Sequence, residues 1–107
     1  MATAPKSEIV QIAALVSYQD GSVVSRQITK ADAGNVTLFA FDKDQELREH
    51  TAPFDALVHV LDGNAEIKIS GTSFNLEAGD AIIMPANEPH ALKATTQFKM
   101  LLTMIRN

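Results

Sequence analysis

The chain has 107 residues, which suits one domain with one hydrophobic core. Its net charge is −4 and its nine basic residues are scattered, so nothing indicates a nucleic-acid surface. It has no cysteine, which excludes disulfides, thiolate metal sites and a cysteine nucleophile. No apolar run is long enough to span a membrane, and the start MATAPKSE lacks the layout of a secretory signal. We therefore expect a cytoplasmic protein with no membrane partner.

The N-terminal region has a different pattern from the rest of the chain. Residues 1–7 are small and polar and contain a proline, so we expect a flexible tail. Ser7 is placed to cap a short helix over about residues 8–16. Four apolar side chains would share one face of this helix: Ile9, Ile12, Ala13 and Val16.

From residue 23 onward the apolar pattern has a period of two, which is typical of strands. Turn dipeptides such as Asp62-Gly63 and Ser70-Gly71 separate the apolar segments, whereas the acidic stretch over 42–49 reads as a solvated loop. Short strands with frequent turns predict one all-β domain over residues 8–107, an antiparallel sandwich or barrel. We expect eight strands, over residues 23–30, 36–41, 56–61, 65–70, 73–76, 81–84, 90–94 and 98–105.

Two segments, about 45–63 and 79–94, resemble the paired motifs of the cupin superfamily. The first family motif reads Gly, five residues, His-x-His, three or four residues, Glu, six residues, Gly. The second reads Gly, five residues, Pro-x-Gly, two residues, His, three residues, Asn, and Gly79, Pro85 and His90 fall on its positions. The resemblance implies a small jelly-roll barrel, commonly dimeric, whose motif histidines and glutamate hold one divalent metal at the barrel mouth.

The first motif is degenerate in this chain. Counting back from Gly63 places Ala56 at the family's glutamate, and His50 and Ala52 at the His-x-His pair. Of four expected ligands, only His50 and His90 remain. In a shifted register with His50 as the second histidine of the pair, Asp55 falls at the carboxylate position instead. The gap from Asp55 to Gly63 is then one residue too long, and a β-bulge would absorb the extra residue. His50, His90 and Asp55 are therefore the candidate ligands for zinc, iron, manganese or nickel.

Alternation along 56–61 separates an inner from an outer face of the barrel. If Ala56 points inward, His59 points outward and is expected to serve packing rather than ligand binding. Apolar residues on the outer face need a cover, which a second subunit or the 8–16 helix would provide, so we expect a homodimer. These outward residues are Leu57, Leu61, Leu101 and Ile105.

We predict a small-molecule-binding cupin barrel with a reduced metal site, which senses, carries or sequesters a metabolite. His50 and His90 would line its mouth, with apolar walls such as Phe54 and Met84. The alternative is a metal-dependent cupin enzyme of the dioxygenase, isomerase or decarboxylase type, using His50 and His90 with or without Asp55. A third possibility is an interaction module with a filled barrel.

Overall fold

The computed structural model describes residues 3–106 of the chain, and its regular structure is almost entirely β. The only helical segment within that range is a four-residue 3₁₀ helix, η1 (Ile12–Leu15). The strands are β1 (Val23–Ala31), β2 (Gly34–Phe41), β3 (Glu46–His50), β4 (Phe54–Asp62), β5 (Asn64–Ile69), β6 (Thr72–Glu77), β7 (Ala81–Met84), β8 (His90–Ala94) and β9 (Phe98–Arg106).

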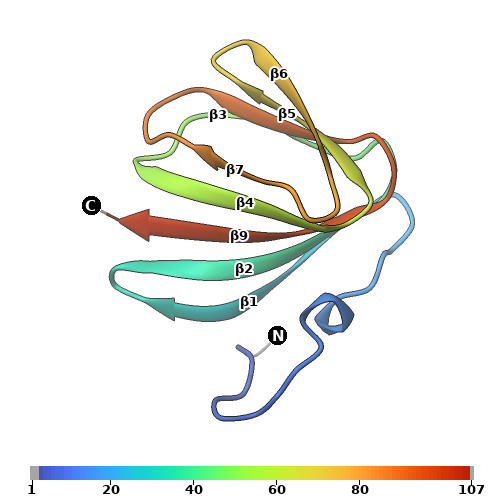
Figure 1. Cartoon of the computed structure of the whole chain (residues 1–107), viewed down its shortest axis with the longest axis vertical. Helices are drawn as coiled ribbons and strands as arrows, with labels where there is room; N and C mark the ends of the chain where they lie inside the picture. Colours follow the sequence, from blue (N-terminus) through green and yellow to red (C-terminus); the bar gives the residue numbers. More distant parts are fainter. Residues whose placement is uncertain (1–2, 107) are drawn as a thin grey trace.

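The strands form two antiparallel sheets that face one another as the two layers of a barrel (Figure 1). Sheet A has the order β1-β2-β9-β4-β7, and sheet B has the order β3-β8-β5-β6. Neighbours in each sheet are often distant in sequence, such as β2 beside β9, which is the connectivity of a jelly roll rather than of a simple meander. The expected all-β, jelly-roll fold is confirmed.

One strand was not expected from the sequence. The residues of β3, Glu-Leu-Arg-Glu-His, are mostly charged and exposed, and the predicted solvated loop over 42–49 is wrong for the first four of them. They pair with β8 at the edge of sheet B, where only Leu47 packs against the core. An edge strand with a single inward apolar side chain carries too little alternation to be recognised.

The predicted helix over 8–16 is wrong in its length and type. Ser7 has φ of +60°, whereas a capping residue takes an extended backbone, and the residue that precedes η1 makes no side-chain cap. Ile9 is 99% exposed, so the expected apolar face does not form. Instead, Leu15, Val16 and Tyr18 pack on the outer face of sheet A, where the N-terminal segment lies across β1 and β2 (Figure 1).

The N-terminal segment is tied to the barrel by polar contacts as well. The Lys99 ammonium donates to the Ala13 carbonyl at 2.6 Å and lies over the Tyr18 ring, whose hydroxyl donates to Asp62 at 2.5 Å. Burial and Asp62 together raise the pKa of Tyr18, so the hydroxyl stays a donor. Within the predicted tail, Ala4 donates its amide to the Ile28 carbonyl at 3.0 Å; residues 1–2 lie outside the described part of the chain.

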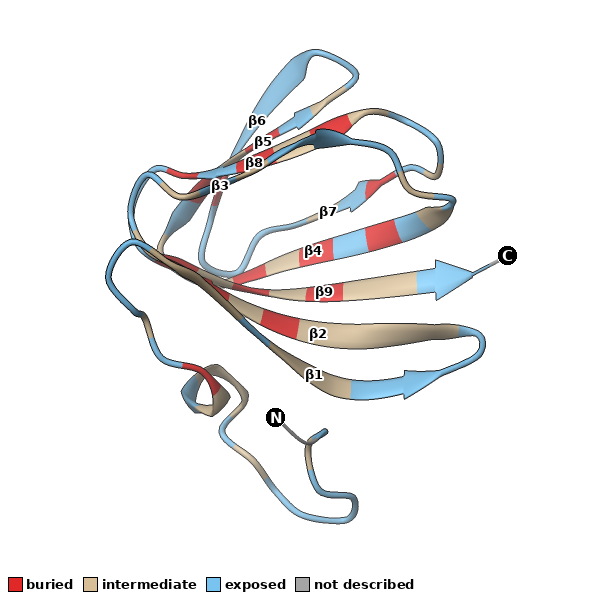
Figure 2. Ribbon diagram, turned by 180° about the vertical axis from the view of Figure 1, so that it is seen from behind, coloured by how far each residue is buried: buried red, intermediate tan, exposed pale blue. Residues whose placement is uncertain are grey.

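The core lies between the sheets and is densest toward one end of the barrel (Figure 2). Phe41 and Phe98 stack there at 4.5 Å between ring centroids, and both are fully buried. Gly63 closes the β4–β5 turn at this end with φ of +74°, a value that glycine adopts readily. An added Cβ would lie 1.9 Å from the Gln97 carbonyl oxygen, so only glycine fits.

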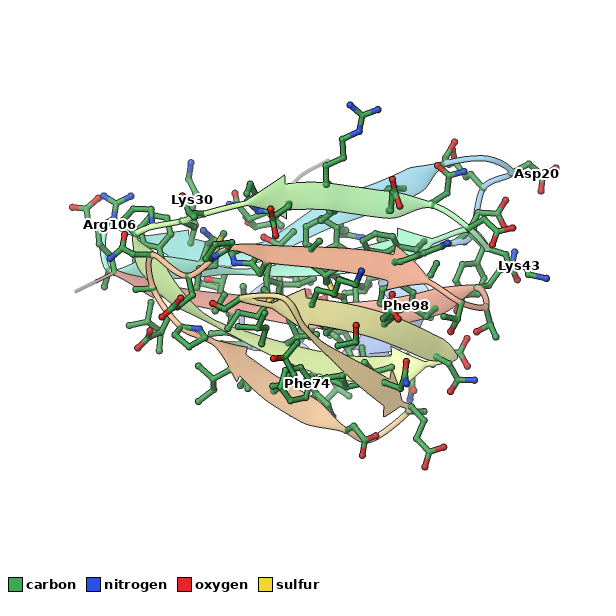
Figure 3. The ribbon with its side chains drawn as sticks, turned by 90° about the horizontal axis from the view of Figure 1, so that it is seen from above. Asp20, Lys30, Lys43, Phe74, Phe98 and Arg106 are labelled. Carbon is green, nitrogen blue, oxygen red and sulfur yellow. The ribbon has the colours of Figure 1, made fainter. Side chains whose placement is uncertain are left out.

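The opposite end is the mouth of the barrel. At this end β1 and β9 finish, β2 and β4 begin, and β3 finishes at His50 beside the first residue of β8, His90. Figure 3 shows Lys30 and Arg106 at this end and Lys43 and Phe98 at the other. The loops that precede β4 and β8 join at the rim, where the Asn87 amide donates to the Ala52 carbonyl at 2.8 Å.

Candidate functional site

The structure brings two of the predicted site residues, His50 and His90, into direct contact. Their Nε2 atoms lie 3.1 Å apart and the rings meet edge to face at 4.4 Å between centroids. His90 is buried, whereas His50 is exposed at the rim. A β-bulge makes the contact possible, because Leu47 pairs with Leu92 and His50 with His90, which leaves one extra residue on β3. In a regular ladder continued from the Leu47–Leu92 pair, Glu49, not His50, would oppose His90.

The contacts of the two rings require three protons. The Nδ1 atom of His50 lies 2.7 Å from the Arg48 carbonyl oxygen, and that of His90 lies 3.2 Å from the Glu88 carbonyl oxygen. A carbonyl only accepts, so each Nδ1 must carry a proton, and the contact between the Nε2 atoms needs a third. Two neutral imidazoles carry two such protons. All three contacts are therefore satisfied only when the pair holds one additional proton or a cation.

The surroundings of His90 oppose protonation of its ring. Burial lowers the pKa of His90 below its ordinary value, and the charge of His50 lowers it further. The hydrogen bond to the Glu88 carbonyl acts in the opposite direction and is the weakest of the three effects. The surroundings of His90 therefore disfavour a positive charge on its ring.

Asp55 does not join the histidines. It lies on the exposed face of β4, and its carboxylate accepts a hydrogen bond from the Ala86 amide at 2.9 Å. A bulge does occur in β4, but it lies between Val60 and Asp62, beyond the segment that sets the direction of Asp55. Across residues 3–106 no three His, Cys, Asp or Glu side chains come close enough to share a metal ion. The described residues thus offer two donors where catalytic zinc sites use three, so a metal held by this pair would need further ligands from water or substrate.

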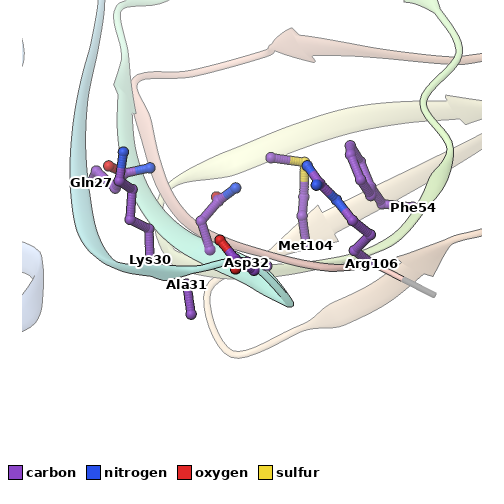
Figure 4. Close-up of a pocket in the computed structure, with 9 residues that line it drawn as sticks. Gln27, Lys30, Ala31, Asp32, Phe54, Met104 and Arg106 are labelled. Atoms are coloured by element: carbon purple, nitrogen blue, oxygen red, sulfur yellow. The ribbon is translucent and has the colours of Figure 1, made fainter.

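A cavity of about 470 Å³ opens at the mouth, on the inner face of sheet A (Figure 4). Paired positions on four strands supply its wall, because Lys30 lies opposite Asn35, Asn35 opposite Met104, and Phe54 opposite Arg106. The Arg106 guanidinium lies over the Phe54 ring at 5.3 Å from its centroid, a cation–π contact. The cavity is lined by Gln27, Lys30, Ala31, Asp32, Gly34, Asn35, Phe54, Met104 and Arg106.

A second bulge aims Lys30 into this cavity. Gln27 pairs with Thr37 and Thr29 pairs with Val36, so Ile28 is an extra residue on β1. Strict alternation from Gln27 would have turned Lys30 to the outer face. The bulge reverses that direction, and Figure 4 shows Lys30 beside Gln27 on the cavity wall opposite Phe54 and Arg106. Bulges at barrel rims often re-aim a side chain in this way.

The remaining candidates from the sequence occupy different places. Phe54 lines the cavity, whereas Met84 is 2% exposed and packs in the core, opposite Ala56. His59 is half-buried and lies between Ala81 and Leu101 on neighbouring strands, on the face of β4 away from the core. Lys30, Arg106, Gln27 and Asn35 were not singled out from the sequence. Arg106 could have been found, since it follows Phe98, Met100, Leu102 and Met104 on the same face of β9.

The comparisons with known proteins agree with this geometry. The family model described as a cupin domain matches residues 37–106. The chain belongs to the cupin family. No curated protein matches the sequence. A conserved Streptococcus pyogenes protein of unknown function is 32% identical, with a TM-score of 0.92 over 100% of this chain and 96% of that one.

Two further solved structures carry the cupin name. A cupin 2 conserved barrel domain protein from Leptotrichia buccalis is 38% identical, with a TM-score of 0.88; the match covers 91% of this cupin but 47% of that chain. A cupin superfamily protein from Desulfitobacterium hafniense is 24% identical and has a TM-score of 0.92, covering 99% of this chain and 97% of that one. It shows the fold alone. Among the described residues of this cupin, no helix has the length and hydropathy needed to cross a membrane.

Proposed function

We propose that this cupin is a small-molecule-binding barrel, which takes its ligand at the mouth and senses, carries or sequesters it. The observation that carries the proposal is the cavity of about 470 Å³ on the inner face of sheet A. Its size falls in the range of small-molecule sites, and its lining combines an aromatic ring and a thioether with five polar or charged side chains. Such a lining can bury the body of a ligand and fix its orientation.

The His50–His90 pair supports the same function. It lies at the same end of the barrel as the cavity, and its three contacts call for a positive charge. A ligand that donates a proton to the pair supplies the hydrogen for the contact between the Nε2 atoms. An anionic ligand beside the pair would stabilise the resulting positive charge. The pair thus gives the mouth a polar anchor that is independent of the cavity wall.

An NMR titration with a library of small metabolite-like molecules tests this function. Binding should shift the backbone amide signals of Asn35, Phe54 and Met104 and leave those of the outer face unchanged. His50→Ala should alter the binding, whereas the matched variant His59→Ala on the outer face should not. If no member of the library perturbs the mouth residues, the binding function is wrong.

A metal-dependent cupin enzyme is the second candidate, and the orientation of the two histidines favours it. Both Nδ1 atoms face backbone carbonyls and both Nε2 atoms face each other, as in histidines that bind a metal. His50 and His90 would hold the ion, which would act as a Lewis acid, and water or substrate would complete its coordination. Elemental analysis of purified wild type, His50→Ala and His59→Ala separates the two functions. A stoichiometric metal lost only in His50→Ala favours the enzyme.

We also propose that the cupin is a homodimer through the outer face of sheet A. Leu57 lies opposite Ile83 in the register of β4 and β7, and both are exposed, by 38% and 59%. Ile105, 57% exposed, extends the same face on β9, and a second copy related by a two-fold axis would bury this surface against itself.

Light scattering should give twice the chain mass for wild type and for Phe74→Lys on sheet B. Ile83→Lys should give the mass of one chain; a dimeric Ile83→Lys would refute this interface.

A further inference from the structure

We propose that the ligand of the mouth is a small organic carboxylate with an apolar body, bound by Lys30 and Arg106 with its body against Phe54 and Met104. This inference rests on the proposed binding function and names the chemical class of the ligand. It follows from the charge of the cavity, from the way its cations are positioned, and from the apolar part of its wall.

The net charge of the cavity lining has the opposite sign to the net charge of the chain. The whole chain carries −4, yet the residues that line the cavity include two cations, Lys30 and Arg106, and one carboxylate, Asp32. The lining therefore has one net positive charge. A concave site with low-dielectric walls concentrates such a charge and attracts ions of the opposite sign, so the expected ligand is an anion.

The two cations lie on either side of the cavity floor. Lys30 is on β1 and Arg106 is on β9, with Asn35 of β2 between them as the cross-strand neighbour of Lys30 and of Met104. Strands in a sheet are about 4.8 Å apart, so the two charges flank a space wide enough for one carboxylate. The planar guanidinium suits bidentate binding of a carboxylate, and the Asn35 amide can donate to the same group.

The apolar wall decides between classes of anion. Phe54 and Met104 provide a flat ring and a thioether beside the cations, which inorganic ions such as phosphate would leave unused. Asp32 also lines the cavity, and its charge would repel a multiply charged anion. A singly charged carboxylate with an aromatic or aliphatic body uses both the cations and the apolar wall.

The inward direction of the Lys30 side chain is set by the bulge in β1, not by regular alternation along the strand. The bulge at Ile28 turns it inward, and the carbonyl of Ile28 accepts a hydrogen bond from the Ala4 amide. The bulge is thus held by a hydrogen bond from outside the sheet. Arg106 is held over the Phe54 ring at 5.3 Å, so both charges are oriented before a ligand arrives.

Calorimetric and NMR titrations with benzoate and 3-phenylpropanoate, each compared with its neutral amide, test the proposal. We expect both carboxylates to bind at the mouth and each amide to bind at least tenfold more weakly. Lys30→Gln and Arg106→Gln should each weaken the carboxylates about tenfold, and Lys68→Gln, on the exposed part of sheet B, should have no effect. Higher salt should weaken binding in wild type.

The outcomes separate this inference from the function on which it rests. Two results would refute the carboxylate ligand but leave the proposed binding function intact. One is equal affinity for each acid and its amide; the other is wild-type affinity for the acids in Lys30→Gln and Arg106→Gln. If neutral molecules of the library bind the mouth and neither acid does, the ligand class is wrong and the binding function stands. If no small molecule shifts the mouth residues, both the ligand class and the binding function are wrong. Circular dichroism of each variant checks that it is folded.

Discussion

The two ends of the barrel are built from the same strands but have opposite character. Along the inner face of β9, Phe98 and Met100 are fully buried, Met104 is half-buried, and Arg106 is exposed. The inner face of β2 follows the same course from Phe41 at the closed end to Asn35 at the mouth. One side of one sheet thus changes from an apolar core to a polar cavity within a single strand length.

This gradient indicates how the fold divides its tasks. At the closed end the side chains fill the space between the sheets, as the stacked Phe41 and Phe98 rings do, and their contacts stabilise the barrel. At the mouth the strands of sheet A carry half-buried and exposed side chains that line the cavity. Substitutions at the closed end should therefore affect folding, and those at the mouth should affect binding.

The largest expected effect contrasts two phenylalanines. Phe98→Ala removes a fully buried ring and should lower the free energy of unfolding by about 3 to 5 kcal/mol. Phe54→Ala removes a half-buried ring at the mouth and should cost about 1 kcal/mol, while it weakens ligand binding. Urea denaturation of both variants measures the difference. Equal losses would show that the two ends are packed alike.

Two glycines with positive φ provide a second comparison. Gly63→Ala, at the closed end, places a Cβ 1.9 Å from the Gln97 carbonyl oxygen and should cost about 3 kcal/mol. Gly71→Ala lies in the β5–β6 turn, where an added Cβ meets nothing within 4 Å, so only the backbone strain of about 1 kcal/mol remains. Thermal unfolding ranks the two, and a more damaging Gly71→Ala would contradict the steric argument.

The smallest expected effect is a pH dependence of stability that arises at the mouth. The pKa of His90 is lowered in the folded protein, so below about pH 6.5 the unfolded chain binds more protons than the folded one. The contribution of His90 is complete above pH 6.5 and is lost as the pH falls through its folded pKa. Denaturation at pH 7.5 and 5.5 should show this loss for wild type. It should be smaller for His90→Gln, whereas His59→Gln should retain it.

The parts of the fold with regular alternation could be predicted from the sequence. Strands β7 and β8 have the expected boundaries, and the alternation that buries Ala56, Val58 and Val60 was read correctly. Two elements were missed because their structure depends on partners. The edge strand β3 has one inward apolar side chain, and the N-terminal segment takes its shape from the sheet face on which it packs.

The candidate site could be predicted only in part, and for a related reason. Motif spacing singles out His50 and His90, and the two rings lie in contact. Asp55 would turn inward only with a bulge near it, and the bulge in β4 lies farther along the strand. Lys30 was missed because the bulge at Ile28 changes its direction, and nothing in the local composition marks that residue as extra.

The bulges in β1 and β3 have a consequence for the history of such barrels. A chain that keeps its residues but loses the bulge at Ile28 resumes strict alternation from Gln27, so Lys30 and its neighbours exchange faces. Gain or loss of a bulge in a rim strand can therefore replace the lining of the mouth in one step, while the closed end keeps its core. Site residues should be transferred between cupins by strand pairing, since counting along aligned sequences assigns them to the wrong face wherever a bulge has come or gone.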